Sequence, residues 1–509
     1  MSGRRRFAGW LGVFALLPGA ESGFSAPPTA DALVPSGGQA GTEVPLLTVV
    51  GKMDPWPCQA WCSNPEVKFS PGEKAGQFKV SIGKGAKVGP CLVWIHNAEG
   101  ASEPRTFVVT QLREIIEDET ANENPAQAIS VGALPVVVNG RLDKSQDFDA
   151  WKVSLKKSQT LLARLDGYAL RSGIDPFLHL YDSRGVRLVL ESDGPTNLDP
   201  RMEFTAEADD DYVVGVMAID HPPSTSVSFS GSAKGAYRLT LAIGDLKEDT
   251  AGVGDGEAPG PDSLPPGAAA ASVPLSGFGT LEKAGEADRV LFSAKKGSNL
   301  LIELDAVDHG FPTDPVLILE KPDGSVIREV DDDKASRDAS YVFKVPADGE
   351  YVCRITDRFG RGGKAIRYFL RISEESQDFT VSSEQLGMVV KAGESVQWKV
   401  KIERQGGHAV ALVATAKGLP SGVTAEPLKL DGKTNEGTLE IKCGKEAAAF
   451  SGPIQIEVKE DGGRAGLLRP AAYSFQNADA RGPYLIDQVN DLWLTVTVPA
   501  PKASPEAKK

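Results

Sequence analysis

Histidine and cysteine are scarce in this chain, and their scarcity limits the chemistry that it can carry. Each occurs five times in 509 residues. No histidine lies in the His-Glu-x-x-His motif of zinc peptidases, and neither a Gly-x-Ser-x-Gly nucleophile turn nor a phosphate-binding loop is present. His179 aligns with Ile318 in the internal repeat described below, which indicates packing rather than reactivity. We therefore predict no catalytic residues and no enzymatic activity.

Basic residues and long hydrophobic runs are also few. The chain has 55 Lys and Arg against 69 Asp and Glu, a net charge of −14, which argues against nucleic-acid binding because phosphate contacts need clustered positive charge. The main apolar run, Phe7–Ala20, is shorter than the ~20 residues of a membrane-spanning helix. It follows three arginines, a pattern typical of an export signal. We predict a signal peptide at residues 1–22, a disordered spacer at 23–43, and a secreted, periplasmic or cell-surface protein whose mature chain has no transmembrane segment.

The few cysteines are candidates for a disulfide, since an exported protein folds in an oxidising compartment. Cys58, Cys62 and Cys91 lie close together in the sequence, whereas Cys353 and Cys443 are isolated and are expected to be free. In an extended segment Cys58 and Cys62 would lie about 13 Å apart on one face, too far to pair with each other. A zinc site would lack a well-placed fourth ligand. We predict one disulfide that joins Cys91 to Cys58 or to Cys62.

Short runs of alternating apolar and polar residues, separated by Gly, Pro, Asp and Ser, fill most of the chain. This period of two is typical of β-strands, and its spacing predicts an all-β protein of tandem β-sandwich domains. The expected domains are a small immunoglobulin-like domain, two β-sandwiches and a C-terminal immunoglobulin-like sandwich, at residues 44–112, 132–244, 273–374 and 377–500. Between and after them we expect an acidic linker, a flexible linker and a tail, at residues 113–131, 245–272 and 501–509.

The two central domains are copies of one another. "DPFLHLYDSRG" begins at Asp175 and "DPVLILEKPDG" begins at Asp314, an offset of 314 − 175 = 139 positions. The same offset holds without a gap from Gly140 to Val213 of the first copy, with many identical pairs. Chance does not preserve one register over such a length. The sequence therefore predicts a duplicated domain, and we refer to its copies as the first and second repeat.

Both repeats carry the same ordered motifs. Each has a Gly-x-Leu start, an acidic residue before a strand, a Lys-Lys turn, an Asp-Pro-x-Leu-x-Leu hairpin and a C-terminal Tyr-x-Leu, which is Tyr237-Arg238-Leu239 in the first repeat. This set resembles the bacterial pre-peptidase C-terminal domain family. The family has Tyr-Arg-Leu at this last motif, and the second repeat departs from that sequence because it has Phe369 in place of the arginine. The resemblance implies that each repeat is a non-catalytic, jelly-roll-like β-sandwich of the kind attached to secreted peptidases or cell-surface proteins.

The resemblance also implies calcium. Some members of this family hold the ion where an acidic linker meets the Asp-x-Asp loop, and "EDETANENPAQA" at residues 117–128 is similar to that linker, with one extra residue before Asn122 and no Pro after Glu119. The candidate ligands are Glu117, Glu119, Asn122, Glu123, Asp147 and Asp149. The alternative is a solvated acidic linker beside turn-forming aspartates. No other cofactor is expected.

Together these features favour a secreted, non-catalytic binding, adhesion or scaffold protein of the cell envelope. Its partner would be an extracellular protein or polysaccharide that the sequence does not identify. One alternative is an accessory, substrate-binding subunit of an extracellular protease or glycan-degrading system. Another is an unrecognised hydrolase that uses the acidic loops at Asp193 and Asp332, although loop aspartates in sandwiches more often form turns.

Overall fold

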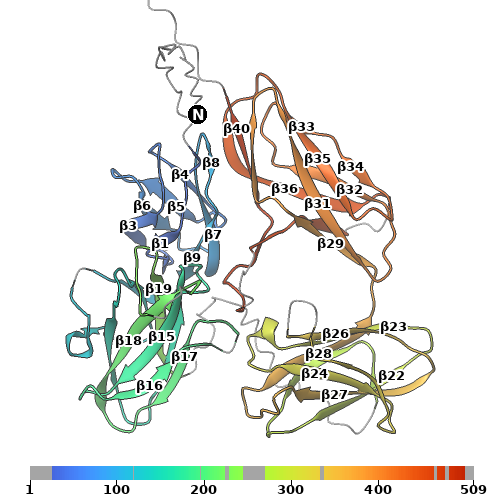
Figure 1. Cartoon of the computed structure of the whole chain (residues 1–509), viewed down its shortest axis with the longest axis horizontal. Coiled ribbons are helices and arrows are strands. Elements are labelled where there is room, and N and C mark those ends of the chain that lie inside the picture. Colours follow the sequence, from blue (N-terminus) through green and yellow to red (C-terminus); the bar gives the residue numbers. More distant parts are fainter. Residues whose placement is uncertain are drawn as a thin grey trace, which may run out of the picture.

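The computed structural model consists almost entirely of β-strands and their connections. It describes residues 26–118, 120–194, 196–223, 228–244, 270–332, 337–462, 467–475 and 481–498. The strands form four successive sandwiches, which run from blue through green and yellow to red in Figure 1. The described helical elements are two short turns, η1 (Pro125–Gln127) and η2 (Val307–His309). The predicted all-β class of tandem sandwiches is confirmed.

Several predicted segments lie outside the described residues. They are the signal peptide at 1–22, most of the flexible linker (245–269) and the tail at 501–509. Within the described ranges, no helix is long and apolar enough to cross a membrane.

The N-terminal domain consists of two facing sheets. One contains, in spatial order, β1 (Ala32–Val34), β3 (Glu43–Val50), β6 (Gln77–Ile82) and β5 (Val67–Pro71). The other contains β2 (Gly37–Gln39), β9 (Arg105–Thr110), β7 (Gly89–Asn97) and β4 (Gln59–Cys62), with β8 (Gly100–Ala101) paired to β7.

The spacer predicted at residues 23–43 is wrong for its described part, residues 26–43. There β1 pairs antiparallel with β3, β2 pairs in parallel with β9, and the Leu33 side chain is only 2% exposed. Strands of three residues are too short to show a periodic pattern, so only their partners later in the chain define them.

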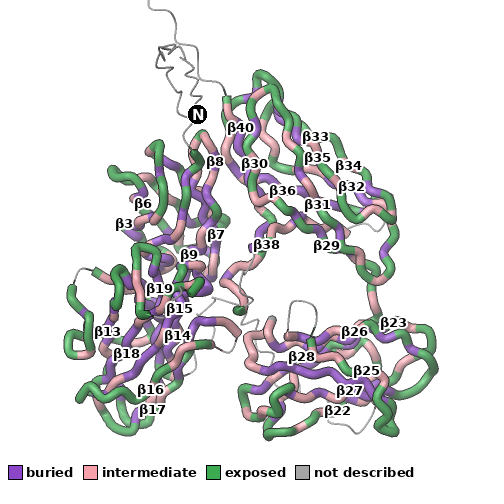
Figure 2. The backbone as a smooth tube through the Cα atoms, in the orientation of Figure 1, coloured by how far each residue is buried: buried purple, intermediate pink, exposed green. Residues whose placement is uncertain are grey.

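The first repeat pairs a five-stranded sheet with another five-stranded sheet. The first sheet has the order β10 (Arg113–Ile116), β12 (Val136–Arg141), β19 (Ala236–Ile243), β14 (Thr160–Asp166) and β17 (Arg201–Thr205). The second has the order β11 (Ile129–Ser130), β13 (Asp149–Leu155), β18 (Asp210–Asp220), β15 (Ile174–Tyr181) and β16 (Arg187–Glu191). Their inner faces enclose Trp151, Leu165, Leu178 and Tyr237, and Figure 2 shows these strands as a buried layer with exposed turns at its ends.

The second repeat has the same strand order, which confirms the duplication. One sheet has the order β21 (Leu275–Thr280), β28 (Arg367–Glu374), β23 (Asn299–Asp305) and β26 (Ala339–Lys344). The other has the order β20 (Ala271–Ser272), β22 (Asp288–Ala294), β27 (Gly349–Asp357), β24 (Pro315–Glu320) and β25 (Val326–Val330). Gly185 and Gly324 close equivalent hairpin turns with φ of 79° and 86°, which explains why both turn motifs end in glycine. Among the described strands only β10 has no counterpart.

The segment predicted as an acidic linker, residues 113–131, contributes strands to the first repeat. β10 pairs in parallel with β12, and β11 pairs in parallel with β13. Ile115 and Ile129 pack against the core of that repeat. The domain therefore begins near Arg113 rather than at residue 132. In the same way, β20 places residues 271–272 of the predicted flexible linker in the second repeat.

The C-terminal domain is also a sandwich. One sheet contains β29 (Asp378–Ser383), β31 (Ser395–Gln405), β35 (Glu436–Cys443) and β33 (Val423–Ala425). The other contains β30 (Gly387–Lys391), β40 (Leu492–Thr497), β36 (Phe450–Glu460), β32 (Leu412–Lys417), β34 (Leu428–Leu430), and β37 (Leu468–Pro470) beside β36. Between β37 and β40, a short ribbon of β38 (Tyr473–Ser474) and β39 (Gln488–Val489) leaves the sandwich.

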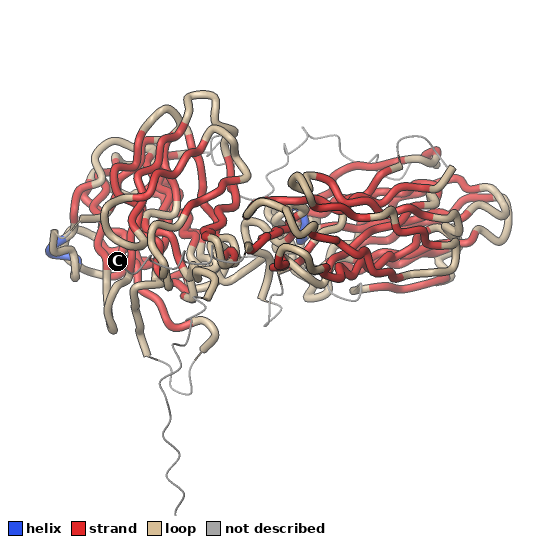
Figure 3. The backbone as a smooth tube through the Cα atoms, turned by 90° about the horizontal axis from the view of Figure 1, so that it is seen from above, coloured by secondary structure: helices blue, strands red, loops and turns tan. Residues whose placement is uncertain are grey.

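The C-terminal domain returns to contact the N-terminal domain and the first repeat. The indole rings of Trp94 on β7 and Trp493 on β40 are stacked, with centroids 5.8 Å apart, in a buried cluster that includes Phe475. The Leu485 N–H donates to the Ala169 carbonyl at 3.0 Å. Figure 3, seen from above, shows the strands gathered in two bodies that lie side by side. The first and last described domains are therefore neighbours, although they are separated by two repeats in the sequence.

Candidate functional site

The predicted calcium ligands gather where β10 ends and β13 begins. Glu117 directly follows β10, and its N–H donates to the Asn139 carbonyl of β12 at 2.9 Å. Asp149 is the first residue of β13, in the opposite sheet, and Asp147 lies in the turn before it. A cavity of about 440 Å³ is lined by all of the candidates that the structure describes: Glu117, Asn122, Glu123, Asp147 and Asp149. Glu119 lies outside the described residues.

Hydrogen bonds fix both carboxyl groups at the centre of this cavity. The Glu117 Oε2 atom accepts from the Arg141 N–H at 2.8 Å, and Oε1 accepts from Asn122 Nδ2 at 3.1 Å. The Asp149 Oδ2 atom accepts from the Tyr237 hydroxyl at 2.8 Å. The two carboxyl groups also interact directly with each other.

This environment disfavours negative charge on Asp149. Its side chain is 2% exposed, and burial, followed by the neighbouring Glu117 carboxylate, raises the pKa of Asp149 to about 9. Burial also raises the pKa of Glu117. Two buried carboxyl groups in contact can be neutralised by a proton or by a bound cation.

The donor set suits calcium in its chemistry, because that ion takes six to eight oxygen ligands. Glu117, Asp149 and the Asn122 side chain offer such oxygens, whereas Glu123 is engaged by Lys144 Nζ at 2.5 Å. Both Asp147 oxygens accept backbone N–H groups, from Asp143 at 2.7 Å and Phe148 at 3.1 Å. In the described part of the chain, no group of three or more His, Cys, Asp or Glu is arranged as a metal site. Calcium at this cavity therefore stays a prediction, with Glu117 and Asp149 as the residues that would hold it.

The second repeat retains half of this arrangement. The Tyr368 hydroxyl donates to Asp288 Oδ2 at 2.6 Å, as Tyr237 does to Asp149. Gly279 allows this approach, since an added Cβ would lie 2.2 Å from the Tyr368 hydroxyl, and the same holds for the glycine of β12 in the first repeat. The Asp–Tyr pair is thus part of the fold of both repeats. The position of Glu117 is particular to the first repeat, because this residue directly follows β10, which has no counterpart among the described strands of the second repeat.

A buried ion pair beside this cavity was missed by the sequence interpretation. Arg238 on β19 is 2% exposed, and its guanidinium donates to Glu114 Oε1 at 2.9 Å and to Asn139 Oδ1 at 2.7 Å. β2 of the N-terminal domain covers it so closely that a Cβ on Gly37 would lie 1.8 Å from Arg238 Nη1. The one sequence signal was Arg238 itself, which we interpreted only as part of a family motif. This ion pair joins the N-terminal domain, β10 and the first repeat.

The cysteines lie as the sequence allows, but one of the two possible pairings is favoured. Cys62 Sγ is 3.5 Å from Cys91 Sγ, because β4 and β7 are antiparallel neighbours. Cys58 Sγ instead points to the Met53 carbonyl at 3.7 Å. All five cysteines, including Cys353 and Cys443, are free thiols in this structure. The disulfide stays a prediction, and the geometry selects Cys62 as the partner of Cys91.

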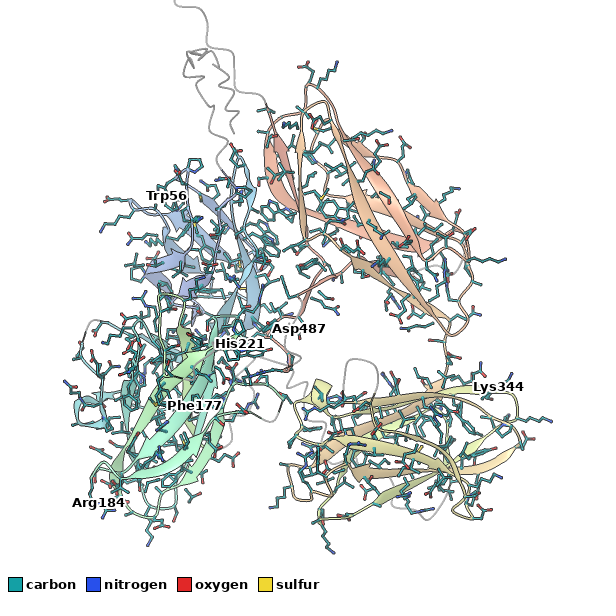
Figure 4. All side chains as sticks on the ribbon, viewed as in Figure 1. Trp56, Phe177, Arg184, His221, Lys344 and Asp487 are labelled. Carbon is teal, nitrogen blue, oxygen red and sulfur yellow. The ribbon has the colours of Figure 1, made fainter. Side chains whose placement is uncertain are left out.

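The contact between the C-terminal domain and the first repeat was not predicted either. The Tyr168 and Tyr484 rings lie 5.1 Å apart, and the Tyr168 hydroxyl donates to the Gly482 carbonyl at 3.0 Å. His221 packs edge-on against Tyr168, and Figure 4 labels His221 and Asp487 on the two sides of this contact. The acidic loops of the hydrolase alternative lie in different repeats, with Asp193 in the first and Asp332 in the second.

Comparisons with known proteins give no family. No family model matches the chain, and no curated protein matches it. The similar solved structures include the pre-peptidase C-terminal domain of a Bacillus anthracis collagenase, with 12% identity over 25% of this chain and 100% of that chain, at a TM-score of 0.17. They also include fibronectin(III)-like modules of Clostridium thermocellum CbhA, with 13% identity over 44% of this chain and 95% of that chain, at 0.15. A third is surface layer protein SbsC, with 10% identity over 93% of this chain and 55% of that chain, at 0.16. TM-scores this low carry no argument about this protein.

Proposed function

We propose that this chain is an exported, non-catalytic binding or scaffold protein of the cell envelope, and that its two central domains are related to the pre-peptidase C-terminal family. The observation that supports this proposal best is that buried contacts join its domains to one another. Buried contacts of Trp493 with Trp94, and of Tyr484 with Tyr168, join the last domain to the first domain and to the first repeat. Such contacts hold several sandwich surfaces in one fixed arrangement, which serves binding or assembly.

Three features of the acidic residues favour a non-catalytic role. The Asp149 carboxyl accepts a hydrogen bond from the Tyr237 hydroxyl, and Asp288 accepts the equivalent bond in the second repeat. Two carboxylates that cleave a glycosidic bond must face one substrate across roughly 5–10 Å. Asp193 and Asp332 belong to loops of separate repeats, so these two do not form such a pair within one domain.

We also propose that the Glu117–Asp149 pair binds calcium in the exported protein. Calcium would neutralise these two carboxyl groups, whose pKa values are both raised by burial, and that of Asp149 also by Glu117. Because Glu117 follows β10 and Asp149 begins β13, the ion would tie the two sheets of the first repeat together. The chemistry that it would supply is structural, not catalytic.

The proposal is tested with the purified full chain against pooled peptide and glycan substrates, together with binding to isolated cell-envelope fractions. We expect saturable binding without turnover. Turnover that disappears in both Asp193→Ala and Asp332→Ala would refute the non-catalytic assignment. Matched Ala variants of the exposed residues Glu207 and Glu350 control for general effects of charge removal.

A further inference from the structure

The two repeats differ at one edge of one sheet. In the first repeat β12 lies between β10 and β19, whereas among the described strands of the second repeat its counterpart β21 is the outermost and pairs with β28. The pairing registers make the two positions equivalent, since Asn139 faces Arg238 on β19 and Phe278 faces Phe369 on β28. The first repeat therefore shows which element fits this edge, namely a strand that runs parallel to it.

The backbone of β21 is oriented to receive such a strand. In the first repeat the Asn139 carbonyl accepts the Glu117 N–H, and the Arg141 N–H is bound by the Glu117 carboxylate. Alternate residues of a strand direct their backbone groups to the same side. By this equivalence the N–H and C=O groups of Ser276, Phe278 and Thr280 point away from β28, toward the edge.

The side chains at this edge select an apolar strand. In the first repeat Arg238 and Asn139 bind the Glu114 carboxylate of β10. In the second repeat these two positions are Phe369 and Phe278, whose rings are 4.8 Å apart and only partly buried. A carboxylate in the position of Glu114 would lose its ion pair there, while an aliphatic or aromatic side chain would bury the two rings.

Negative charge at the C-terminal end of β21 favours a basic residue in the strand that would bind there. Asp288 is flanked by Glu286 and Glu282, and after burial these two carboxylates raise the pKa of Asp288. Arg367 is nearby, but its guanidinium lies over the rings of Phe278 and Phe311, at 5.5 and 4.7 Å. A parallel strand would end beside these carboxylates, so a basic residue after its apolar part is complementary.

The chain itself is poorly suited to supply this strand. The pairing registers align Ala271 with Val131, because Ile129 pairs with Trp151, Ala271 pairs with Phe292, and Phe292 lies 139 positions after Val153. The offset is 271 − 131 = 140, so residues 253–256 correspond in sequence to β10. Those four residues are Val-Gly-Asp-Gly, in which two glycines and an aspartate disfavour a strand.

We propose that the β21 edge of the second repeat binds an extended segment of another protein, in parallel, whose apolar residues are followed by Lys or Arg. This inference deepens the proposed binding function and rests on it. The recognition is strand addition, in which main-chain hydrogen bonds give affinity and the rings of Phe278 and Phe369 give selectivity for apolar side chains.

The test uses the full chain and a fluorescein-labelled decapeptide that alternates Thr with Ile and Val and ends in two lysines. Fluorescence anisotropy should show saturable binding to the wild type. Ser276→Pro removes one N–H that faces the edge and spares the ladder to β28, so it should weaken binding at least tenfold, while the control Ser276→Ala should bind like the wild type. Phe278→Glu should also weaken binding at least tenfold, which keeps the test valid if the proline variant is misfolded.

Three outcomes would overturn the proposal. The first is equal binding to the wild type and to both edge variants. The second is equal binding of a peptide with Glu in place of both lysines, which would remove the assigned chemistry. The third is a wild-type dimer that Ser276→Pro makes monomeric, since a second copy would then occupy the edge. None of these outcomes produces turnover, so failure here is distinguishable from failure of the non-catalytic assignment.

Discussion

Replacing Asp149 with Asn should remove a pH dependence of stability that the first repeat creates. Asn has the shape of a protonated Asp and keeps an oxygen that can accept from the Tyr237 hydroxyl. In the native protein the pKa of Asp149 is raised to about 9, by burial and then by Glu117. In the unfolded chain it returns to about 3.9. The native state therefore holds one more proton than the unfolded state between these two values.

The sign and size of the effect follow from this difference. The free energy of unfolding changes with pH by 2.303RT times the protons bound in the unfolded state minus those bound in the native state, which is about −1.4 kcal/mol per pH unit for one proton. Stability supplied by Asp149 is thus complete below pH ~4 and is lost as the pH rises toward ~9. From pH 5 to pH 8 the upper bound is about 4 kcal/mol, and we expect about half of it because Glu117 shares the charge.

The assay is urea unfolding of the full chain in a chelator at several pH values between 5 and 9. The free energy of unfolding of the wild type should fall relative to Asp149→Asn by about 2 kcal/mol across pH 5 to 8. Calcium should abolish that fall in the wild type and leave the variant unchanged. Asp288→Asn in the second repeat is the matched control, since Asp288 is less buried than Asp149 and should show a smaller effect. Parallel pH profiles for wild type and Asp149→Asn would refute this account of the carboxyl pair.

Three further predictions concern the Arg238–Glu114 ion pair, the Cys62–Cys91 pairing and the strands β10 and β11. Arg238→Met should destabilise the chain by about 3–5 kcal/mol in denaturant unfolding, because its carboxylate partner on β10 would stay buried without a counter-charge; a change below 1 kcal/mol would contradict the ion pair's importance. Peptide mapping of the oxidised, exported protein without reductant should recover Cys62 linked to Cys91, and a bond from Cys91 to any other cysteine would refute this pairing. A fragment of residues 113–244 should melt cooperatively and at a higher temperature than residues 132–244, which lacks β10 and β11; equal melting would show that these strands contribute nothing.

Most strands of this protein could be predicted because each carries its own pattern. In β13 the inward positions Trp151, Val153 and Leu155 alternate with half-exposed or exposed residues, and the structure buries those three in the core. The turn glycines Gly185 and Gly324 were identifiable for a similar reason, since a positive φ favours glycine wherever it occurs. Such information is local, so it survives in a single sequence.

The candidate site could be predicted only in part. Repetition of sequence motifs placed Asp147 and Asp149 before a strand, and the family resemblance added the residues from Glu117 onward. The raised pKa of Asp149 was not predictable, because it depends on burial between two sheets and on the nearby carboxylate of Glu117, which follows β10. The Arg238–Glu114 ion pair was missed because its two partners are 124 positions apart and nothing local marks them as neighbours.

The sequence by itself determined the all-β class, the duplication and the positions of most strands, because alternation of burial and turn chemistry are properties of short segments. Tertiary structure alone decided that β1 and β2 belong to the N-terminal domain, that β10 closes one edge of the first repeat while β21 stays at an edge, and that Cys62 rather than Cys58 lies beside Cys91. It also decided that Trp493 returns to Trp94. Each of these facts is a choice of partner between distant segments, and that choice depends on which surfaces fit together and exclude water, which no short stretch of sequence specifies.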